Sequence, residues 1–117
     1  MALNTNGLNA QVGGLTAVAA FASLHTAAPN ESGSSEVTGG SYTRESISWG
    51  AASGGTAVSS ANIVFDVPTG TTITHLGYWS ASTSGTFYGS RALDTSQTFS
   101  TAGTYTISAG NLSESVS

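Results

Sequence analysis

Short runs of β-branched and aromatic residues recur from residue 41 onward, each bounded by glycine, serine, asparagine or proline. Such runs predict strands, because branched and aromatic side chains fit a pleated surface and the bounding residues supply turns. The predicted strands are residues 41–49, 61–67, 72–80, 86–91, 95–100, 104–108 and 112–116. Short strands at this spacing are typical of sandwiches and barrels. We therefore expect a mainly β protein, an Ig-like or jelly-roll-like β-sandwich of about seven or eight short strands.

The first 40 residues follow a different pattern. Leu3, Leu8 and Val12 have approximate helical spacing, but glycines interrupt it, and each glycine costs about 1 kcal/mol in a helix interior. We expect residues 1–14 to form an N-terminal arm or a short helix, and residues 15–117 to form the β-sandwich domain. Within that domain, alternation over 16–26 favours a strand although its alanines also suit a helix, whereas 27–40 and 54–60 have the composition of loops.

An apolar stretch at 15–28 resembles part of a signal peptide, yet no positive charge precedes it. It is also shorter than the 18 or more residues of a membrane span. Export and membrane insertion are therefore not expected.

Charged residues make up only 7% of the 117 residues, with no lysine, two arginines and a net charge of -4. Binding to nucleic acid or to an anionic membrane relies on clustered basic residues, so neither partner is expected. The polar surface must instead come from 20 serines, 17 threonines and 15 glycines. The predicted core consists of large or strand-centred residues: Trp49, Ile63, Phe65, Val67, Ile73, Gly77, Trp79, Phe87, Phe99, Tyr105, Ile107 and Ala109.

Residues able to carry chemistry are few. A Ser-His-Asp arrangement can arise by chance among so many serines, and no G-x-S-x-G elbow occurs. His25 and His75 could hold a metal with Asp66 or Glu45, but no H-x-x-x-H spacing supports such a site, and cysteine is absent. A half-buried histidine with a hydrogen-bonded ring is the favoured interpretation. We expect no catalytic residues, no cofactor and no metal.

Two kinds of contact site remain. Arg44 can pair bidentately with a carboxylate, within the subunit or across an interface, and with Leu3, Leu8 and Val12 it is a predicted assembly contact. Aromatic side chains could alternatively form a platform for stacking on sugars, although core or interface positions are favoured for them. The candidate platform residues are Tyr42, Tyr78, Trp79 and Tyr88.

Four segments follow one another along the chain: SLHTAAPNE at 23–31, EVTGGSYTRESISW at 36–49, ITHLGYWSASTSGTFYGSRAL at 73–93 and SAGNLS at 108–113. In this order and spacing they resemble a family of small bacteriophage virion proteins often labelled tail-fibre proteins. The residues that match the family's pattern are Leu24, His25, Thr26, Gly39, Gly40, Tyr42, Arg44, Thr74, His75, Gly77, Trp79, Gly110 and Leu112. The opening segment departs from the family's pattern, in which a longer helix with charged residues is common.

The resemblance implies a non-enzymatic virion protein that is assembled in the host cytoplasm and acts by subunit contacts. One short domain without heptads or repeats cannot build a fibre shaft alone, so we expect a subunit on the exterior of the particle. Capsid decoration is slightly favoured over a tail or tail-fibre position. The implied partners are a major capsid or tail protein and further copies of the chain, as a homo-oligomer with a trimer as one option. The alternative function is a carbohydrate-binding module for host recognition.

Overall fold

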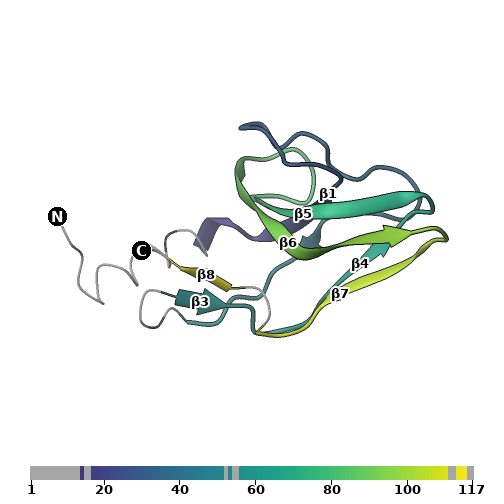
Figure 1. Ribbon diagram of the computed structural model, residues 1–117. Coiled ribbons are helices and arrows are strands. Elements are labelled where there is room, and N and C mark those ends of the chain that lie inside the picture. Colours follow the sequence, from purple (N-terminus) through teal and green to yellow (C-terminus); the bar gives the residue numbers. More distant parts are fainter. Residues whose placement is uncertain (1–13, 15–16, 52, 54–55, 111–112, 116–117) are drawn as a thin grey trace.

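The computed structural model describes residues 14, 17–51, 53, 56–110 and 113–115 of the chain (Figure 1). Its regular elements are eight strands, all paired antiparallel. They are β1 (Phe21–His25), β2 (Glu45–Ser46), β3 (Thr56–Val58), β4 (Ile63–Val67), β5 (Thr71–Trp79), β6 (Phe87–Phe99), β7 (Gly103–Ile107) and β8 (Ser113–Ser115). The expected mainly β fold is confirmed.

One layer is a four-stranded sheet in the order β2-β1-β5-β6, and β4 pairs with β7 in the facing layer. A third pair, β3 with β8, forms a ribbon beyond the ends of β4 and β7 (Figure 1). The two layers enclose the hydrophobic core, so the architecture is that of a β-sandwich.

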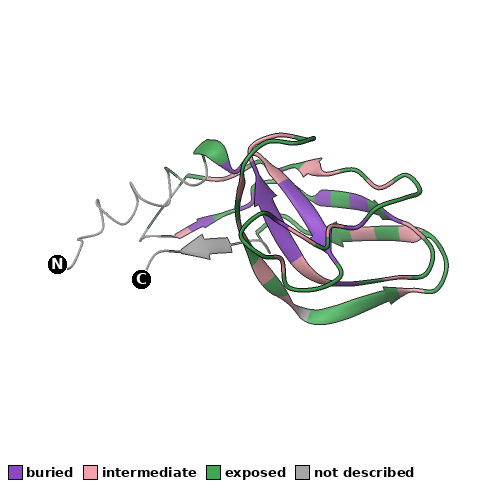
Figure 2. Cartoon of the chain, turned by 90° about the horizontal axis from the view of Figure 1, so that it is seen from above, coloured by how far each residue is buried: buried purple, intermediate pink, exposed green. Residues whose placement is uncertain are grey.

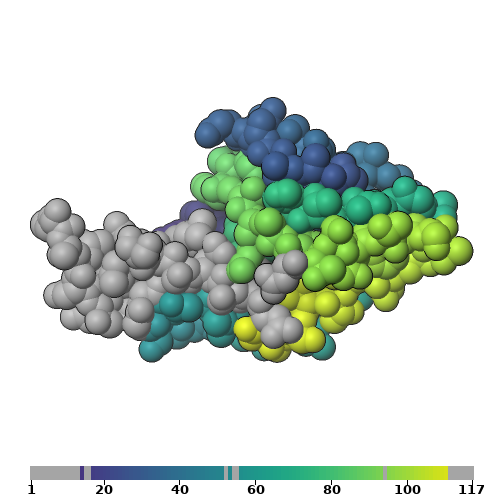
Figure 3. Space-filling view, in the orientation of Figure 1, coloured from purple at the N-terminus to yellow at the C-terminus, as the bar shows by residue number. Residues whose placement is uncertain are grey.

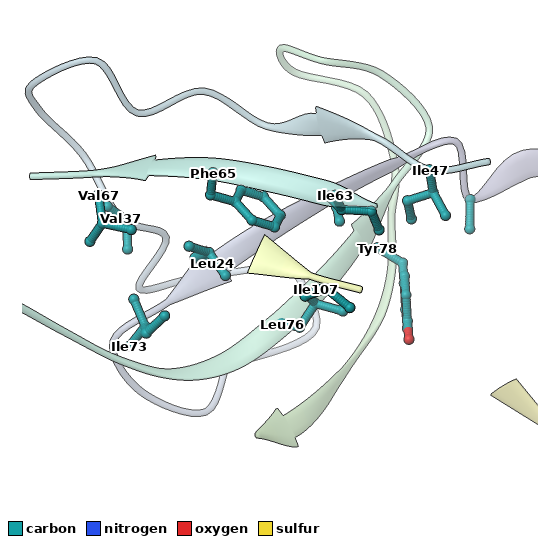
Figure 4. Packing of buried hydrophobic residues seen from close by; sticks show 12 residues of the cluster. Leu24, Val37, Ile47, Ile63, Phe65, Val67, Ile73, Leu76, Tyr78 and Ile107 are labelled. Carbon is teal, nitrogen blue, oxygen red and sulfur yellow. The ribbon is translucent and has the colours of Figure 1, made fainter. Parts of the chain in front are cut away.

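The core arises from simple alternation on the strands. In β4, Ile63, Phe65 and Val67 are buried, while Val64 and Asp66 between them are exposed. These three side chains meet buried residues of β1 and β5 across the sandwich (Figure 4). Each fully buried large apolar side chain contributes roughly 1.5 to 3 kcal/mol relative to exposure. The cluster also includes Ala22, Leu24, Val37, Ile47, Ile73, Leu76, Tyr78 and Ile107.

The strand β1 and the second half of β5, residues 76–79, are buried on both faces, and these parts are purple in Figure 2. Ala22 and Leu24 of β1 face the main core, so Ser23 and His25 point to the other side. The loop after β1 covers that second face. Its backbone returns along the strand, with hydrogen bonds from the Thr26 amide to the Ser35 carbonyl at 2.9 Å and from the Val37 amide to the Leu24 carbonyl at 2.9 Å.

Several sequence-based boundaries need correction. The two strands predicted at 86–91 and 95–100 are one strand, β6, and the predicted loop at 54–60 contains β3. The strand expected at 41–49 is reduced to β2, and the one expected at 16–26 is β1 alone. The strands predicted at 72–80, 104–108 and 112–116 lie within one residue of β5, β7 and β8 at both ends, and the strand predicted at 61–67 begins two residues before β4.

Four members of the predicted core lie elsewhere: Ala109 is on the surface, and Gly77, Trp79 and Phe87 are on the second face of the four-stranded sheet. Trp79 is buried, at 7% exposure, but does not share the main core with Ile73, because Leu76 and Tyr78 occupy that face of β5 and Trp79 lies on the second face. The cause is an irregular register between Ile73 and His75, which breaks the alternation that the sequence suggests.

The predicted arm, 1–14, lies outside the described residues except for Gly14, which is exposed. Its form and the domain boundary at residue 15 therefore remain predictions.

Candidate functional site

A chain of hydrogen bonds runs through the second face of the β1–β5 pair. The Nδ1 atom of His25 lies 2.8 Å from the Ser34 carbonyl, which can only accept, so Nδ1 carries the proton. The Nε2 atom therefore accepts from the Ser23 hydroxyl at 2.6 Å. The Ser23 oxygen in turn accepts from the Trp79 indole N–H at 2.8 Å. Every polar group of this chain is thereby satisfied inside the protein.

A serine hydroxyl hydrogen-bonded to a histidine is the arrangement that activates nucleophiles in hydrolases. Here both side chains are 0% exposed, so no substrate can reach the Ser23 oxygen. The group that orients His25 is a backbone carbonyl, and desolvation by burial lowers the pKa of His25. The Ser23–His25 pair is thus a structural support for the loop after β1.

Next to this chain, Glu36 binds two side chains at once. Its Oε2 atom accepts from Arg44 Nε and from the Tyr42 hydroxyl, both at 2.9 Å, and its Oε1 atom accepts from Arg44 Nη2 at 2.9 Å. The Tyr42 oxygen also accepts from the Leu24 amide at 3.0 Å. Burial is the main reason that the pKa of Tyr42 is raised.

The Arg44 guanidinium joins three segments. Besides its bidentate pair with Glu36, its Nη1 atom donates to the carbonyls of Ala81 at 3.1 Å and Ser84 at 2.8 Å. Its central carbon lies 3.5 Å from the Trp79 ring centroid, in a cation–π contact. With 9% of its side chain exposed, Arg44 is an internal cross-link between the loop after β1, the segment before β2 and the loop after β5.

Two glycines make the close packing possible. A Cβ atom on Gly77 would lie 2.5 Å from Ser23 Oγ and 2.6 Å from His25 Nε2. A Cβ atom on Gly33, whose φ is +78°, would lie 2.5 Å from the Trp79 ring. A larger residue at Gly33 would push the loop away from the sheet, and one at Gly77 would displace the Ser23 and His25 side chains of β1. We call the assembly of Ser23, Gly33, His25, Glu36, Tyr42, Arg44, Gly77 and Trp79 the inner polar cluster.

The predicted contact residues are thus not brought together. Leu3, Leu8 and Val12 lie outside the described residues. Arg44 has its described partners within the chain, and its role in contacts between subunits remains a prediction.

The four aromatic residues of the candidate glycan platform do not share one exposed face either. Tyr78 and Trp79 are consecutive on β5, and they are only 3% and 7% exposed. Tyr42 is half-buried, with its ring stacked on Phe65 at a centroid distance of 6.5 Å. Tyr88 differs from the other three, because 42% of it is exposed. Of the platform residues, Tyr88 alone presents a large surface to solvent.

Residues from three of the four family-like segments meet in the inner polar cluster. His25 comes from the first, Tyr42 and Arg44 from the second, and Gly77 and Trp79 from the third. The sequence alone did not single out Ser23 or Glu36, because serine is abundant and Glu36 lies in a loop-like stretch. The sequence did contain a signal for the pair, because Glu36 stands eight residues before Arg44 in a chain that has only six acidic residues.

No group of three or more histidine or acidic residues that could hold a metal occurs among the residues that the structure describes. His75, one candidate ligand, has its Nδ1 atom 2.8 Å from the Thr74 hydroxyl. Among the described residues there is also no helix long and apolar enough to cross a membrane.

A β-sandwich whose reactive side chains are buried in a supporting cluster has the character of a structural domain. Comparison with known families makes this specific: the chain matches the family of podophage GP4 fiber I protein gp80 over residues 2–115, and it belongs to that family. No curated protein matches the chain.

The family membership confirms the resemblance to phage tail-fibre proteins. The protein is a non-enzymatic structural component of the phage virion, found in a fibre. The slight preference for capsid decoration has no support in this match.

Proposed function

We propose that the protein is a subunit on the exterior of the particle, held in the fibre by contacts with other virion proteins and with copies of itself. The observation that carries this proposal is the position of β6, which is the last strand in the order β2-β1-β5-β6. An edge strand offers unpaired backbone groups to another chain. At 13 residues, β6 is also the longest strand described.

The outer surface of β6 suits such a contact. Most of the described side chains between Ser90 and Thr98 are exposed hydroxyls or small groups, and this part of the strand forms an open face in Figure 3. With a net charge of -4 over the whole chain, copies repel one another only weakly. Exposed valines on other strands, Val58 at 40% and Val64 at 48%, offer further apolar contact area.

The N-terminal arm is the second part of the proposal. Ordering one residue costs roughly 1 to 2 kcal/mol of backbone entropy, so an arm rich in asparagine and glycine needs contacts to be ordered. Leu3, Leu8 and Val12 are its large apolar residues and would supply those contacts on a neighbouring subunit. The number of copies, including a trimer, is part of the same proposal.

Deletion of residues 2–12 tests this proposal in complemented phage particles. We expect the isolated domain to keep its thermal transition while incorporation into particles, measured by quantitative mass spectrometry, falls sharply. A second variant replaces Leu3, Leu8 and Val12 by serine without shortening the chain. It should show the same loss of incorporation. Parental incorporation of both variants, or unfolding of the isolated domain by the deletion, contradicts the proposed role of the arm.

A further inference from the structure

A β-bulge places Tyr88 outside the regular ladder. Tyr78 pairs with Gly89 and Trp79 pairs with Phe87, so Tyr88 is an additional residue with no partner position on β5. Bulges re-aim a side chain away from the ordinary pleat and are common next to functional sites. In this case the bulge accompanies an aromatic ring that is 42% exposed.

The ring borders a surface groove between the bulge and the loop after β1. In Figure 3 the first part of β6, in light green, lies directly beside the blue atoms of this loop. The groove has a volume of about 440 Å³, which falls within the range of small-molecule sites. Its lining residues are Pro29, Asn30, Glu31, Phe87, Tyr88, Gly89 and Ser90.

Both walls of this groove are held in place. On the loop side, Asn30 Oδ1 accepts from the Ser32 amide at 2.9 Å, the Ser32 hydroxyl at 2.8 Å and the Ser34 amide at 3.3 Å. On the strand side, the Phe87 ring packs against Trp79 at a centroid distance of 5.0 Å and against His25 at 6.1 Å. The groove is therefore preformed, which lowers the entropic cost of binding.

We propose that this groove binds one pyranose ring of a neutral saccharide. The apolar C–H face of a pyranose is complementary to the exposed tyrosine ring, and its hydroxyls can donate to the Glu31 carboxylate or exchange hydrogen bonds with the Ser90 hydroxyl. One aromatic face with a few polar groups around it is the usual composition of a small-ligand site.

Charge selects against acidic sugars. Glu31 is the charged residue of the groove lining, and the chain carries a net charge of -4. Arg44, which could otherwise attract an anion, is engaged by Glu36 in the inner polar cluster. A uronic acid would meet repulsion from Glu31, whereas a neutral hexose would meet a hydrogen-bond acceptor.

The test is a titration of the isotope-labelled full chain followed by amide NMR spectra. The probes are the methyl glycosides of glucose, galactose and N-acetylglucosamine, with methyl glucuronide as the acidic comparison, each up to its solubility limit. We expect saturable shifts at the amides of residues 29–31 and 87–90 with at least one neutral probe. Tyr88→Ala should weaken this binding at least about ten-fold, whereas Tyr88→Phe, which keeps the ring face, should retain it within about three-fold.

Val64→Ala removes an exposed side chain from the other layer and serves as the matched control, with no expected change in binding. If Tyr88→Ala disturbs the fold, Glu31→Gln provides an independent readout, because it should remove the discrimination against glucuronide. The proposal is overturned by the absence of saturable shifts with every neutral probe, by binding that survives in Tyr88→Ala, or by preference for glucuronide over the neutral sugars.

Discussion

At the scale of single residues, the unusual part of this protein is the second face of the β1–β5 pair. A core made of apolar side chains tolerates small repacking, whereas hydrogen-bonded polar groups require fixed distances. The hydrogen bond between Ser23 and His25 lies entirely within the protein, with both residues 0% exposed. The absence of a side chain at Gly77 leaves the space that these two side chains occupy. Stability should therefore respond strongly to small changes at these positions.

Gly77→Ala should destabilise the protein by about 1 to 3 kcal/mol, because the added methyl overlaps Ser23 Oγ and His25 Nε2. Urea denaturation of the purified domain measures the loss. Gly103→Ala on β7 is the control, since its Cβ would meet only the edge of the half-buried Phe99 ring at 3.3 Å, and its effect should be smaller. Equal stability of Gly77→Ala and the parent would mean that β1 and β5 can move apart freely.

His25 should make stability depend on pH. Burial lowers its pKa in the folded protein, whereas the unfolded chain titrates near the ordinary value of about 6.5. Below that pH the unfolded state binds more protons than the native state, so the free energy of unfolding falls as the solution is acidified. This contribution is fully present above about pH 6.5 and is lost as pH drops through the lowered pKa.

Thermal unfolding between neutral and mildly acidic pH checks this dependence. The His25→Gln variant, compared with the parent at each pH, should lose the part of the slope that belongs to His25. Glu36, Arg44 and His75 act electrostatically on His25, so a His75→Gln variant separates the second histidine from the first. An unchanged slope in His25→Gln contradicts the assignment.

At the scale of elements, Arg44 connects pieces of chain that lie far apart in sequence. Its guanidinium contacts Glu36 in the loop after β1 and the carbonyls of Ala81 and Ser84 in the loop after β5. The loop after β1 supplies one wall of the groove beside Tyr88, and the loop after β5 leads directly into the start of β6, which supplies the other wall. The cross-link thereby ties the shape of that surface to the interior.

Arg44→Lys should lower stability by about 1 to 3 kcal/mol, because an ammonium group cannot reproduce the bidentate pair, the two carbonyl contacts and the stacking on Trp79. The substitution should also accelerate hydrogen exchange more at the amides of residues 26–36 than at those of β4. A cycle with Glu36→Gln isolates the coupling between the two side chains. Additive effects of the two changes would show that the pair is energetically independent.

Local sequence predicts some of the strands correctly and others only in part. The pattern of Ile63, Phe65 and Val67 predicts β4 and its buried face, because alternation alone decides them. Local sequence predicts β6 as two separate strands, because residues 92–94 lack strand-forming character. Pairing of Ile73 with Gln97 and of His75 with Ala92 joins the pieces and leaves the extra residues in a bulge. The continuity of β6 thus depends on its pairing with β5, and the local sequence of β6 carries no information about that pairing.

The same limit explains the errors at the candidate site. Assigning Trp79 to the main core assumed unbroken alternation along β5, and the irregular register after Ile73 reverses the faces. The strand β3 reads as a loop by composition, and its partner β8 lies more than 50 residues later. The sequence predicts that Arg44 pairs with a carboxylate, and the fold shows that this carboxylate belongs to Glu36.

At the scale of the whole molecule, the scarcity of charge governs how copies and partners meet. The protein has two arginines and six acidic residues, and Arg44 with Glu36 is already paired inside. For the proposed association we therefore expect backbone pairing, hydroxyl groups and apolar contacts to contribute most. Such contacts are not screened by salt.

Attachment of the protein to particles should therefore persist from about 0.1 to about 1 M salt, over which the Debye length falls from about 10 to about 3 Å. Sedimentation of particles followed by quantification of the retained protein checks this. Non-ionic detergent at fixed salt is the comparison condition, because it weakens apolar contacts and leaves ionic ones. Release by salt alone would indicate that ion pairs hold the subunit in place.

The antiparallel pairing of β1 with β5 has a kinetic consequence. Phe21 can pair with Trp79, and His25 with His75, only after about 50 intervening residues have been synthesised. The pairing of β3 with β8 spans a similar length of chain. Folding rates fall as contacting residues become more distant along the chain, so folding in milliseconds to seconds is expected rather than in microseconds. During synthesis the strand β1 therefore leaves the ribosome well before its partner β5, and its apolar residues Phe21 and Leu24 are exposed until β5 follows.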